Sequence, residues 1–310
     1  MERYSRVLGG LLGVACGDAL GGTLEFLSEA EGRIRYGYLK DIIGGGCWDL
    51  EPGEVTDDTM MTLAVAEGIL DDPEDPVSHI GERFINWYKS KPKDIGNIIN
   101  LALSAYLDSG SWSIAAASAH GFNEGISAGN GSLMRCIPVA LYYKNPEVMA
   151  RITEQQSKLT HYDERATRAC VFYNRLVSGY LNGEAKMSFL KEVLADYPEY
   201  SKVLNISKCS IKSSGFVVDS LISALWCFIN TDSFEEAVCE AVNLCGDADT
   251  VGAITGGLAG AYYGAEAVPV RWSEKILVRD KLTELAKRIA GHELGELDEL
   301  GELGTVNQQS

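Results

Sequence analysis

Helical periodicity dominates the pattern of apolar and polar positions along this chain. Residues 79–91, HIGERFINWYKSK, place four apolar side chains on one face of a helix: Ile80, Phe84, Trp87 and Tyr88. Residues 219–230, DSLISALWCFIN, carry the same kind of spacing. The alternation typical of a strand is found in one serious candidate, residues 33–43, RIRYGYLKDII. The pattern therefore predicts an all-α protein with one strand-like exception.

The helical stretches are separated by short polar breaks, such as DDPEDP and KPKD, that are too short to serve as linkers. With 310 residues, 46% of them hydrophobic, the chain can bury a sizeable core. We therefore predict one compact helical domain over residues 1–290. The remaining residues, 291–310, form an acidic low-complexity tail that we expect to be solvated and mobile.

Two predicted helices carry glycine at every fourth position. The positions are Gly9, Gly13, Gly17 and Gly21 in the first helix and Gly252, Gly256, Gly260 and Gly264 in the second. Glycine inside a helix costs about 1 kcal/mol relative to alanine, but this spacing leaves one face open to another backbone. One interpretation is that the two stripes face each other antiparallel, which brings Glu25 level with Asp247 and Asp249. The alternative is that each stripe packs against a different helix.

Charge and cysteine content exclude several classes of protein. The net charge is −17, and without the tail 39 acids still face 27 bases, so the surface repels nucleic acid and anionic membranes. Eight cysteines without a C-x-x-C pair are typical of reduced, buried thiols. The apolar run before Cys16 is short and broken by glycines, and no stretch of about 18 apolar residues occurs. We therefore expect a cytoplasmic monomer without a membrane span.

Two predicted helices begin with acidic residues and threonine. These residues are Thr56, Asp57 and Asp58 in VTDDTMM, and Asp247, Asp249 and Thr250 in GDADTVG. Helix capping explains a threonine and one aspartate at such a start. It explains two adjacent aspartates less well, because consecutive side chains point about 100° apart and only one can serve the cap.

If the two helix starts meet, four carboxylates and two hydroxyls share a small space, and their negative charges repel one another. Two divalent cations would neutralise these charges, and a set of oxygen ligands favours Mg²⁺ or Mn²⁺ over zinc or copper. Only four histidines occur, with no H-E-x-x-H, which argues against a zinc hydrolase. A metal pair can activate water and hold substrate hydroxyls. Two well-capped helices without metal remain the alternative.

A glycine-rich loop, residues 125–132 with the sequence GISAGNGS, precedes a further apolar helix. Backbone N–H groups in such a loop can bind phosphate, although the same residues also form ordinary turns. It is not a P-loop, because no G-x-x-x-x-G-K-[ST] occurs in the chain. His161, at the start of a predicted helix, is by itself more typical of capping or packing than of a functional site.

Taken in order, these motifs resemble the ADP-ribosylglycohydrolase family. They are GLLGVACGDALGGTLEF, VTDDTMM, AGNGSLMRCIPVA, LTHYDERA and GDADTVGAITGGLAGAYYG, within residues 5–270. KSKPKDIGN and SSGFVVDS are most similar to the dinitrogenase reductase-activating subgroup. The resemblance implies an orthogonal bundle of α-helices with a dinuclear Mg²⁺ or Mn²⁺ centre at the bottom of a cleft.

The resemblance also implies roles for individual residues. The metal ligands would be Thr56, Asp57, Asp58, Asp247, Asp249 and Thr250. The residues that would line the ADP-ribose site are Gly96, Asn130, Gly131, Ser132, His161 and Phe216. Phe216 stands at a position where this subgroup is expected to have tyrosine. The catalytic carboxylates would be Glu25 at the cleft mouth, Asp94, Asp58 and Asp249. Whether Glu25 or one of the metal-bound aspartates acts as the base stays open, and Asp94 has the alternative role of a helix N-cap.

The activity implied is metal-dependent hydrolysis that removes ADP-ribose from a modified protein side chain, with arginine expected and a serine or ester linkage as the alternative. Positive charge develops on the ribose in this reaction, which suits an acidic cleft. A non-catalytic ADP-ribose-binding protein of the same fold would be expected to lack metal ligands, and all six positions are filled here. Terpenoid synthesis would need a further acid three residues after Asp58, where Met61 stands.

Overall fold

The structure, a computed structural model, describes residues 2–291, and this part contains α-helices and short 3-10 helices but no β-strand. The α-helices are α1 (Arg3–Gly21), α2 (Glu29–Tyr36), α3 (Asp57–Asp71), α4 (Pro76–Lys89), α5 (Asn97–Ser109), α6 (Trp112–Phe122), α7 (Ile137–Tyr142), α8 (Pro146–Lys158), α9 (Glu164–Leu181), α10 (Lys186–Leu194), α11 (Val217–Ile229), α12 (Phe234–Val242), α13 (Ala248–Tyr263) and α14 (Val270–Ser273). Residues 279–291 form a further helix. The all-α prediction is confirmed, whereas the predicted tail lies, from residue 292, outside the described residues.

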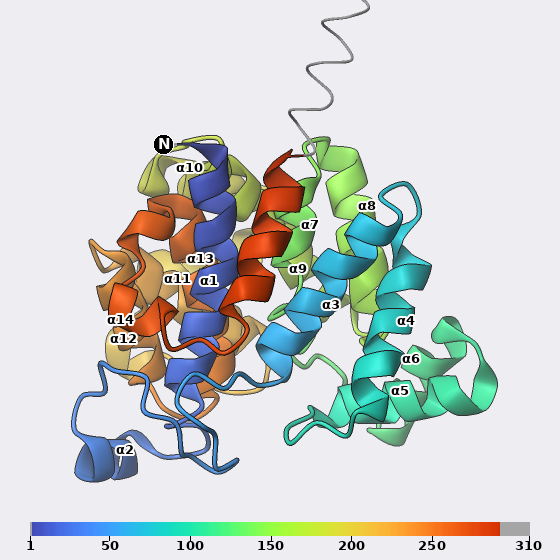
Figure 1. Ribbon diagram of the computed structural model, residues 1–310, viewed down its shortest axis with the longest axis horizontal. Coiled ribbons are helices and arrows are strands. Elements are labelled where there is room, and N and C mark those ends of the chain that lie inside the picture. Colours follow the sequence, from blue (N-terminus) through green and yellow to red (C-terminus); the bar gives the residue numbers. More distant parts are fainter. Residues whose placement is uncertain (1, 292–310) are drawn as a thin grey trace, which may run out of the picture.

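The helices run in crossing directions, as expected of an orthogonal bundle. Figure 1 shows α1 upright beside α13, while α5 and α6 lie across that direction at the other side of the molecule. The apolar faces read from the sequence are buried: Ile80, Phe84 and Trp87 in α4, and Leu221, Leu225 and Phe228 in α11. In the described part of the chain, no helix combines the length and apolar character needed to cross a membrane.

The two glycine stripes face each other, and the interpretation of antiparallel pairing is confirmed. A Cβ added at Gly13 would lie 2.0 Å from the carbonyl oxygen of Gly256, and one added at Gly256 would lie 2.0 Å from that of Gly13. Gly17 meets Gly252 in the same way. Because neither helix has a side chain in this contact, α1 and α13 approach closely, and the end of α1 lies beside the start of α13.

The prediction of a strand over residues 33–43 is wrong. Helix α2 covers the first part of this segment, because Ser28 and Glu31 form a capping box that starts a helix just upstream. The rest of the segment is a loop whose backbone bonds to a side chain and not to a neighbouring strand. The N–H of Leu39 donates to the amide oxygen of Asn243, and the amide nitrogen of Asn243 donates to the carbonyl of Leu39. The alternation in the sequence therefore does not correspond to a sheet.

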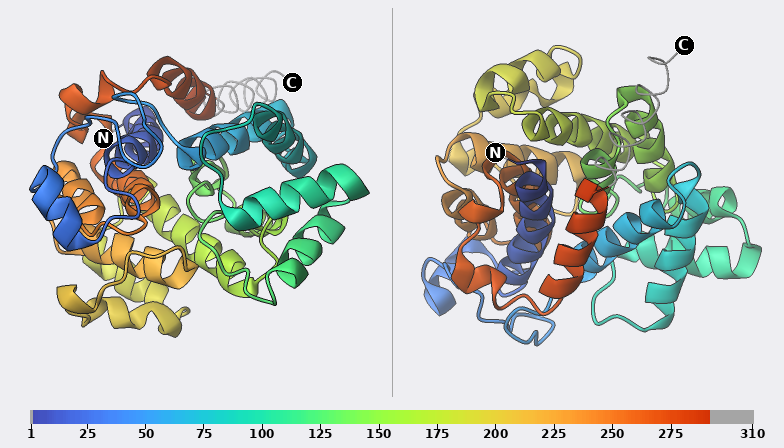
Figure 2. Two further views of the ribbon diagram at one scale, coloured as in Figure 1. Left: turned by 90° about the horizontal axis from the view of Figure 1, so that it is seen from below. Right: turned by 45° about the horizontal axis from the view of Figure 1, so that its top comes forward.

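Several helix termini gather on one side of the molecule. The C-terminus of α1 and the N-termini of α3, α5 and α13 contribute residues to the same cleft or to the polar network beneath it. Figure 2 shows this side in its left panel, where the loops that connect the helices lie in front of them. Since the first turn of a helix has unpaired N–H groups, this side offers several sites for acidic groups.

Candidate metal centre and substrate cleft

A cleft of about 640 Å³ opens where these helix termini meet. Most of the site residues named from the sequence line it: Glu25, Asp57, Asp94, Gly96, Asn130, Gly131, His161, Phe216, Asp247, Asp249 and Thr250. Thr56 and Asp58 are buried next to these residues and join them through hydrogen bonds. Residues separated by more than 200 positions in the sequence thus form one site.

The acidic starts of α3 and α13 are in direct contact. The hydroxyl of Thr250 donates to a carboxylate oxygen of Asp58 over 3.3 Å, and the hydroxyl of Thr56 approaches the same oxygen at 3.4 Å. Asp57 accepts a hydrogen bond of 3.0 Å from the backbone N–H of Gly96, just before α5. The two helix starts therefore meet as the first interpretation of the sequence requires.

Glu25 joins the acids of α13. One carboxylate oxygen from each of Glu25, Asp247 and Asp249 lies within 4.8 Å of the others, a spacing at which three acids can hold one metal ion. The amide of Asn130 donates to Asp247 over 2.5 Å. Glu25 is only 5% exposed, so it belongs to the floor of the cleft and not to its mouth, where the neighbouring Phe26 is 67% exposed.

Burial and mutual repulsion disfavour the charged forms of these acids. Burial, followed by the charges of neighbouring acids, raises the pKa values of Asp58 and Asp249 well above the ordinary range. Burial also raises the pKa of Glu25 to about 7. Burial and the charge of Asp57 raise the pKa of Asp94 to about 9. A cation at this site would favour the charged forms and so offset these shifts.

The residues present fit a divalent metal ion. One carboxylate oxygen of Asp58 and one of Asp249 are buried and accept no hydrogen bond from the described residues. Unpaired buried acceptors are costly, and they are most readily satisfied by a metal ion or ordered water. The candidate metal-ligand atoms at the two helix starts are oxygen atoms of carboxylates and hydroxyls, which are the ligands preferred by Mg²⁺ and Mn²⁺.

Asp18 was not assigned a site role from the sequence, yet its carboxylate holds the start of α3. Thr56 occupies the N-cap position, as predicted, but its side chain makes no capping hydrogen bond. The carboxylate of Asp18 instead accepts from the backbone N–H and the hydroxyl of both Thr56 and Thr59. The sequence does contain a signal, because Asp18 is the only charged residue between positions 7 and 24.

Trp48 is another site residue that the sequence analysis missed. Its indole N–H donates to Glu25 over 2.6 Å, which fixes the orientation of that carboxylate. The indole also meets the ring of Phe26 edge-to-face, with 6.4 Å between centroids. Phe26 has a φ of 60°, in the left-handed region that non-glycine residues rarely adopt. Trp48 lies in an irregular loop, so no periodicity in the sequence marks it.

The opposite wall of the cleft is formed by the glycine-rich loop and His161. A Cβ added at Gly131 would lie 2.8 Å from the terminal side-chain carbon of Ile99 and 3.1 Å from His161, so a larger residue there would push the Ile99 side chain aside. Burial lowers the pKa of His161 to about 3, which keeps its imidazole neutral. Its Nδ1 is 2.8 Å from the hydroxyl of Thr160. This wall presents backbone groups and an uncharged ring to the cleft.

Ser132 and Phe216 occupy different surroundings from each other. Ser132 is fully buried behind the loop, where its hydroxyl is bonded to that of Ser157 at 2.9 Å. The prediction that its side chain lines the ligand is therefore not supported by its placement, because the hydroxyl is used within the core. Phe216 stands at the edge of the cleft, 37% exposed, with the guanidinium of Arg165 5.5 Å from its ring centre.

Asp94 is not a helix N-cap. Helix α5 begins at Asn97 with Gly96 in the cap position, so the capping alternative for Asp94 is wrong. Its carboxylate lines the cleft and accepts no hydrogen bond from the described residues. An acid in this position is available to a ligand.

The motif of two acidic helix starts joined to a glycine-rich loop also matches a known family. The sequence profile of the family described as ADP-ribosylglycohydrolase covers residues 1–298. The chain belongs to this family. It is 35% identical over 279 residues to the ADP-ribosyl-(dinitrogen reductase) glycohydrolase of Rhodospirillum rubrum, a match that covers 88% of this chain and 90% of that protein.

Two further members of the family support this assignment. The ADP-ribosylarginine hydrolase Tri1 of Serratia proteamaculans (strain 568) is 32% identical over 302 residues, covering 93% of this chain and 80% of that protein. A solved structure described as an ADP-ribosylglycohydrolase-related protein complex superposes with a TM-score of 0.80 at 33% identity, covering 93% of this chain and 98% of that one. The resemblance in sequence and the predicted fold of the family are both confirmed.

Proposed function

We propose that this protein hydrolyses the N-glycosidic bond between ADP-ribose and an arginine side chain of a target protein, releasing ADP-ribose. The observation that carries this proposal is the meeting of two acidic helix starts at the floor of one cleft, with two carboxylate oxygens left unpaired there. The names of the relatives from Rhodospirillum rubrum and Serratia proteamaculans agree with this activity.

Two divalent cations, Mg²⁺ or Mn²⁺, would be held by the oxygen donors of the two helix starts, which are Thr56, Asp57, Asp58, Asp247, Asp249 and Thr250. When bound, such cations lower the pKa of water and hold substrate hydroxyls. Asp18 supports this set from beneath, because its four hydrogen bonds fix the first turn of α3. Asn130 supports it from the side through Asp247.

The rest of the cleft can bind the ADP portion of the substrate through backbone N–H groups and an aromatic ring. The N-terminus of α5, which begins at Asn97, lines the same cleft as the loop of Gly129 and Gly131. Unpaired N–H groups in the first turn of a helix and in a glycine-rich loop attract phosphate. Phe216 offers a flat apolar face at the edge of the same cleft, suited to a nucleobase.

In the hydrolysis, water adds to the anomeric carbon while the bond from that carbon to the guanidine nitrogen breaks. The electron pair of the broken bond stays on the guanidine, and a floor carboxylate, Glu25 or one of the aspartates at the two helix starts, accepts the proton that the water loses. The acids around the ribose stabilise the positive charge that develops on its ring. Trp48 holds Glu25 in one orientation, so its carboxylate need not reorganise during the reaction.

The experiment that tests this proposal compares substrates and metals. The protein is incubated with ADP-ribosyl-arginine, ADP-ribosyl-serine and an ADP-ribose ester, with chelator and after addition of Mn²⁺ or Mg²⁺. We expect release of ADP-ribose from arginine, lost in chelator and restored by metal. Asp249→Ala should remain folded but inactive, whereas Asp108→Asn, on the exposed side of α5, should be fully active. Release from serine alone would refute the linkage, and full activity in chelator would refute the metal centre.

We also propose that the protein acts as a monomer in the cytoplasm and that residues 1–290 form one domain. Eight free cysteines, most of them buried, are consistent with a reducing compartment. Light scattering of the purified protein would test the oligomeric state, and a stable dimer at low concentration would contradict it.

A further inference from the structure

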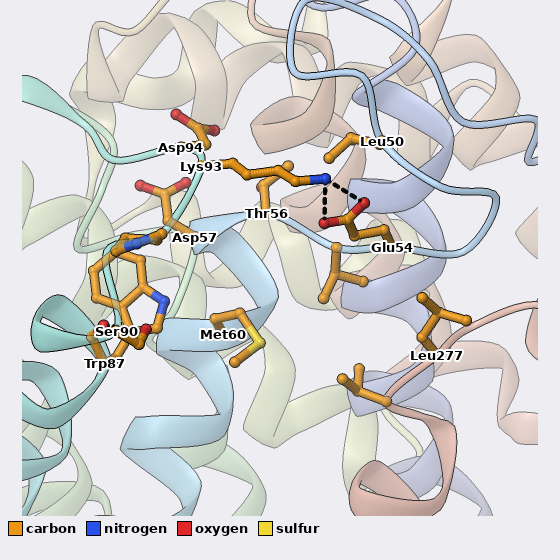
Figure 3. Close-up of a pocket in the computed structure, with 13 residues that line it drawn as sticks. Leu50, Glu54, Thr56, Asp57, Met60, Trp87, Ser90, Lys93, Asp94 and Leu277 are labelled. Carbon is orange, nitrogen blue, oxygen red and sulfur yellow. Dashed lines mark hydrogen bonds and ion pairs between the residues drawn. The ribbon is translucent and has the colours of Figure 1, made fainter.

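A second, smaller cavity of about 270 Å³ lies directly beside the cleft. Figure 3 shows its lining residues, which come from the loop before α3, the start of α3, the end of α4, the loop between α4 and α5, and the segment around Leu277. Asp57 and Asp94 line both this side cavity and the main cleft. The two spaces therefore meet at two acids of the candidate site.

The side cavity changes character from its inner to its outer end. The inner end carries the carboxylates of Asp57 and Asp94, and the walls beyond them are apolar, with Met60 and Trp87 among them. The outer end reaches the protein surface, since Leu277 is 60% exposed. An acidic end followed by apolar walls matches a ligand with a cationic head and a hydrocarbon stem.

The lining offers little to an anionic ligand. Lys93 is the only cation among the residues that line the side cavity, and its ammonium group is already paired with Glu54 at 2.8 Å. Figure 3 shows this ion pair across the cavity, at the height of Thr56. A phosphate or a second nucleotide would thus find no unpaired positive side chain in this lining.

We infer that this side cavity binds the arginine side chain from which ADP-ribose is removed, an inference that rests on the proposed function. The guanidinium is placed against Asp94, whose carboxylate accepts no hydrogen bond from the described residues, and it offers several N–H donors to that group. The indole of Trp87 presents a further surface for a planar cation. The methylene groups lie between the apolar walls, and the backbone of the target protein lies at the rim near Leu277.

This placement explains how one acidic floor can serve two different parts of the substrate. The ADP-ribose occupies the larger cleft, and the leaving arginine occupies the smaller cavity on the other side of Asp57 and Asp94. The bond that breaks then lies between the two spaces, beside both carboxylates. The side cavity contributes to recognition of the leaving group without contacting the nucleotide.

The test uses two substrates that share ADP-ribose and differ in the stem, ADP-ribosyl-arginine and ADP-ribosylguanidine. Leu277→Trp narrows the outer end of the side cavity from an exposed position, so it should not disturb the fold. Its matched control is Val270→Trp, also at an exposed site, which lines neither space. We expect Leu277→Trp to lower kcat/KM on ADP-ribosyl-arginine at least about tenfold, because KM rises. On ADP-ribosylguanidine, kcat/KM of this variant should stay within about twofold of the wild-type value.

The inhibition constant of free ADP-ribose should be unchanged in Leu277→Trp, since that product occupies the main cleft alone. An equal loss on both substrates, or no loss on either, would overturn the side cavity as the arginine site while leaving the proposed activity intact. If the wild-type protein cleaves neither substrate, the proposed function itself fails and the inference fails with it. The melting temperature of each variant shows whether the fold is retained.

Discussion

The contact between α1 and α13 gives a prediction whose size follows from the structure. In Gly13→Ala, the added methyl group would lie 2.0 Å from the carbonyl oxygen of Gly256 and 2.6 Å from its carbonyl carbon. Both atoms belong to the backbone, so no side-chain rotation relieves the clash and the helices must separate by more than 1 Å to restore a contact of about 3.4 Å. Overpacking of this kind costs about 3 kcal/mol, and the higher helix propensity of alanine offsets about 1 kcal/mol of it.

We therefore expect Gly13→Ala to lower the free energy of unfolding by about 2 kcal/mol, measured by urea denaturation with a circular dichroism readout. The control is Gly121→Ala in α6, where an added Cβ meets nothing within 4 Å. That variant should be neutral or more stable by up to about 1 kcal/mol, because only propensity changes. Equal stability of the two variants would refute the view that the glycines are required by close backbone contact.

Three further variants test separate parts of the site. Asp94→Asn should keep the melting temperature of the wild type, because Asp94 caps no helix, while kcat/KM on ADP-ribosyl-arginine falls at least about tenfold, or roughly 1.4 kcal/mol. Asp18→Asn should weaken Mn²⁺ binding about 10- to 100-fold in calorimetry, because an amide cannot accept all four hydrogen bonds; unchanged affinity would exclude this supporting role. Ser132→Ala should lower the melting temperature without changing the Kd for ADP-ribose, and a large change in that Kd would place the hydroxyl back in the cleft.

The features that could be predicted from sequence are those with a regular spacing. The glycine stripes repeat every four residues. Glycine lowers the stability of each helix by itself, and the contact between the stripes explains why both helices contain it. The acidic starts of α3 and α13 could be placed because caps and first-turn acids have local signatures. Pairing the two stripes predicted that Glu25 lies beside Asp247 and Asp249, a long-range contact that the structure contains. The meeting of the α3 and α13 starts was a separate hypothesis, based on the acids that both carry.

The features that were missed depend on contacts without a local pattern. Asp18 reaches a helix that begins 39 residues later, and Trp48 reaches Glu25 from an irregular loop. Ser132 belongs to a loop whose neighbouring residues do line the cleft, but the direction of its own side chain is decided by Ser157 in α8. Alternation over residues 33–43 was misleading because a capping box upstream had already started a helix. Tertiary neighbours determined the outcome for Asp18, Trp48 and Ser132, whereas the helix at residues 29–36 was set by a local capping box that the alternation obscured.

The pairing of α1 with α13 has a consequence for how this protein is made in the cell. Gly13 and Gly256 lie 243 positions apart, so the first helix leaves the ribosome long before its partner is synthesised. During that interval α1 exposes an apolar, glycine-rich surface, because its partner α13 has not yet been synthesised. A nascent chain in this state is prone to associate with chaperones or with other nascent chains. Since α13 also carries two of the acids of the floor, a chain that stops short of it lacks both its central packing and its chemistry. Translation must therefore have passed α13 before folding can produce an active molecule.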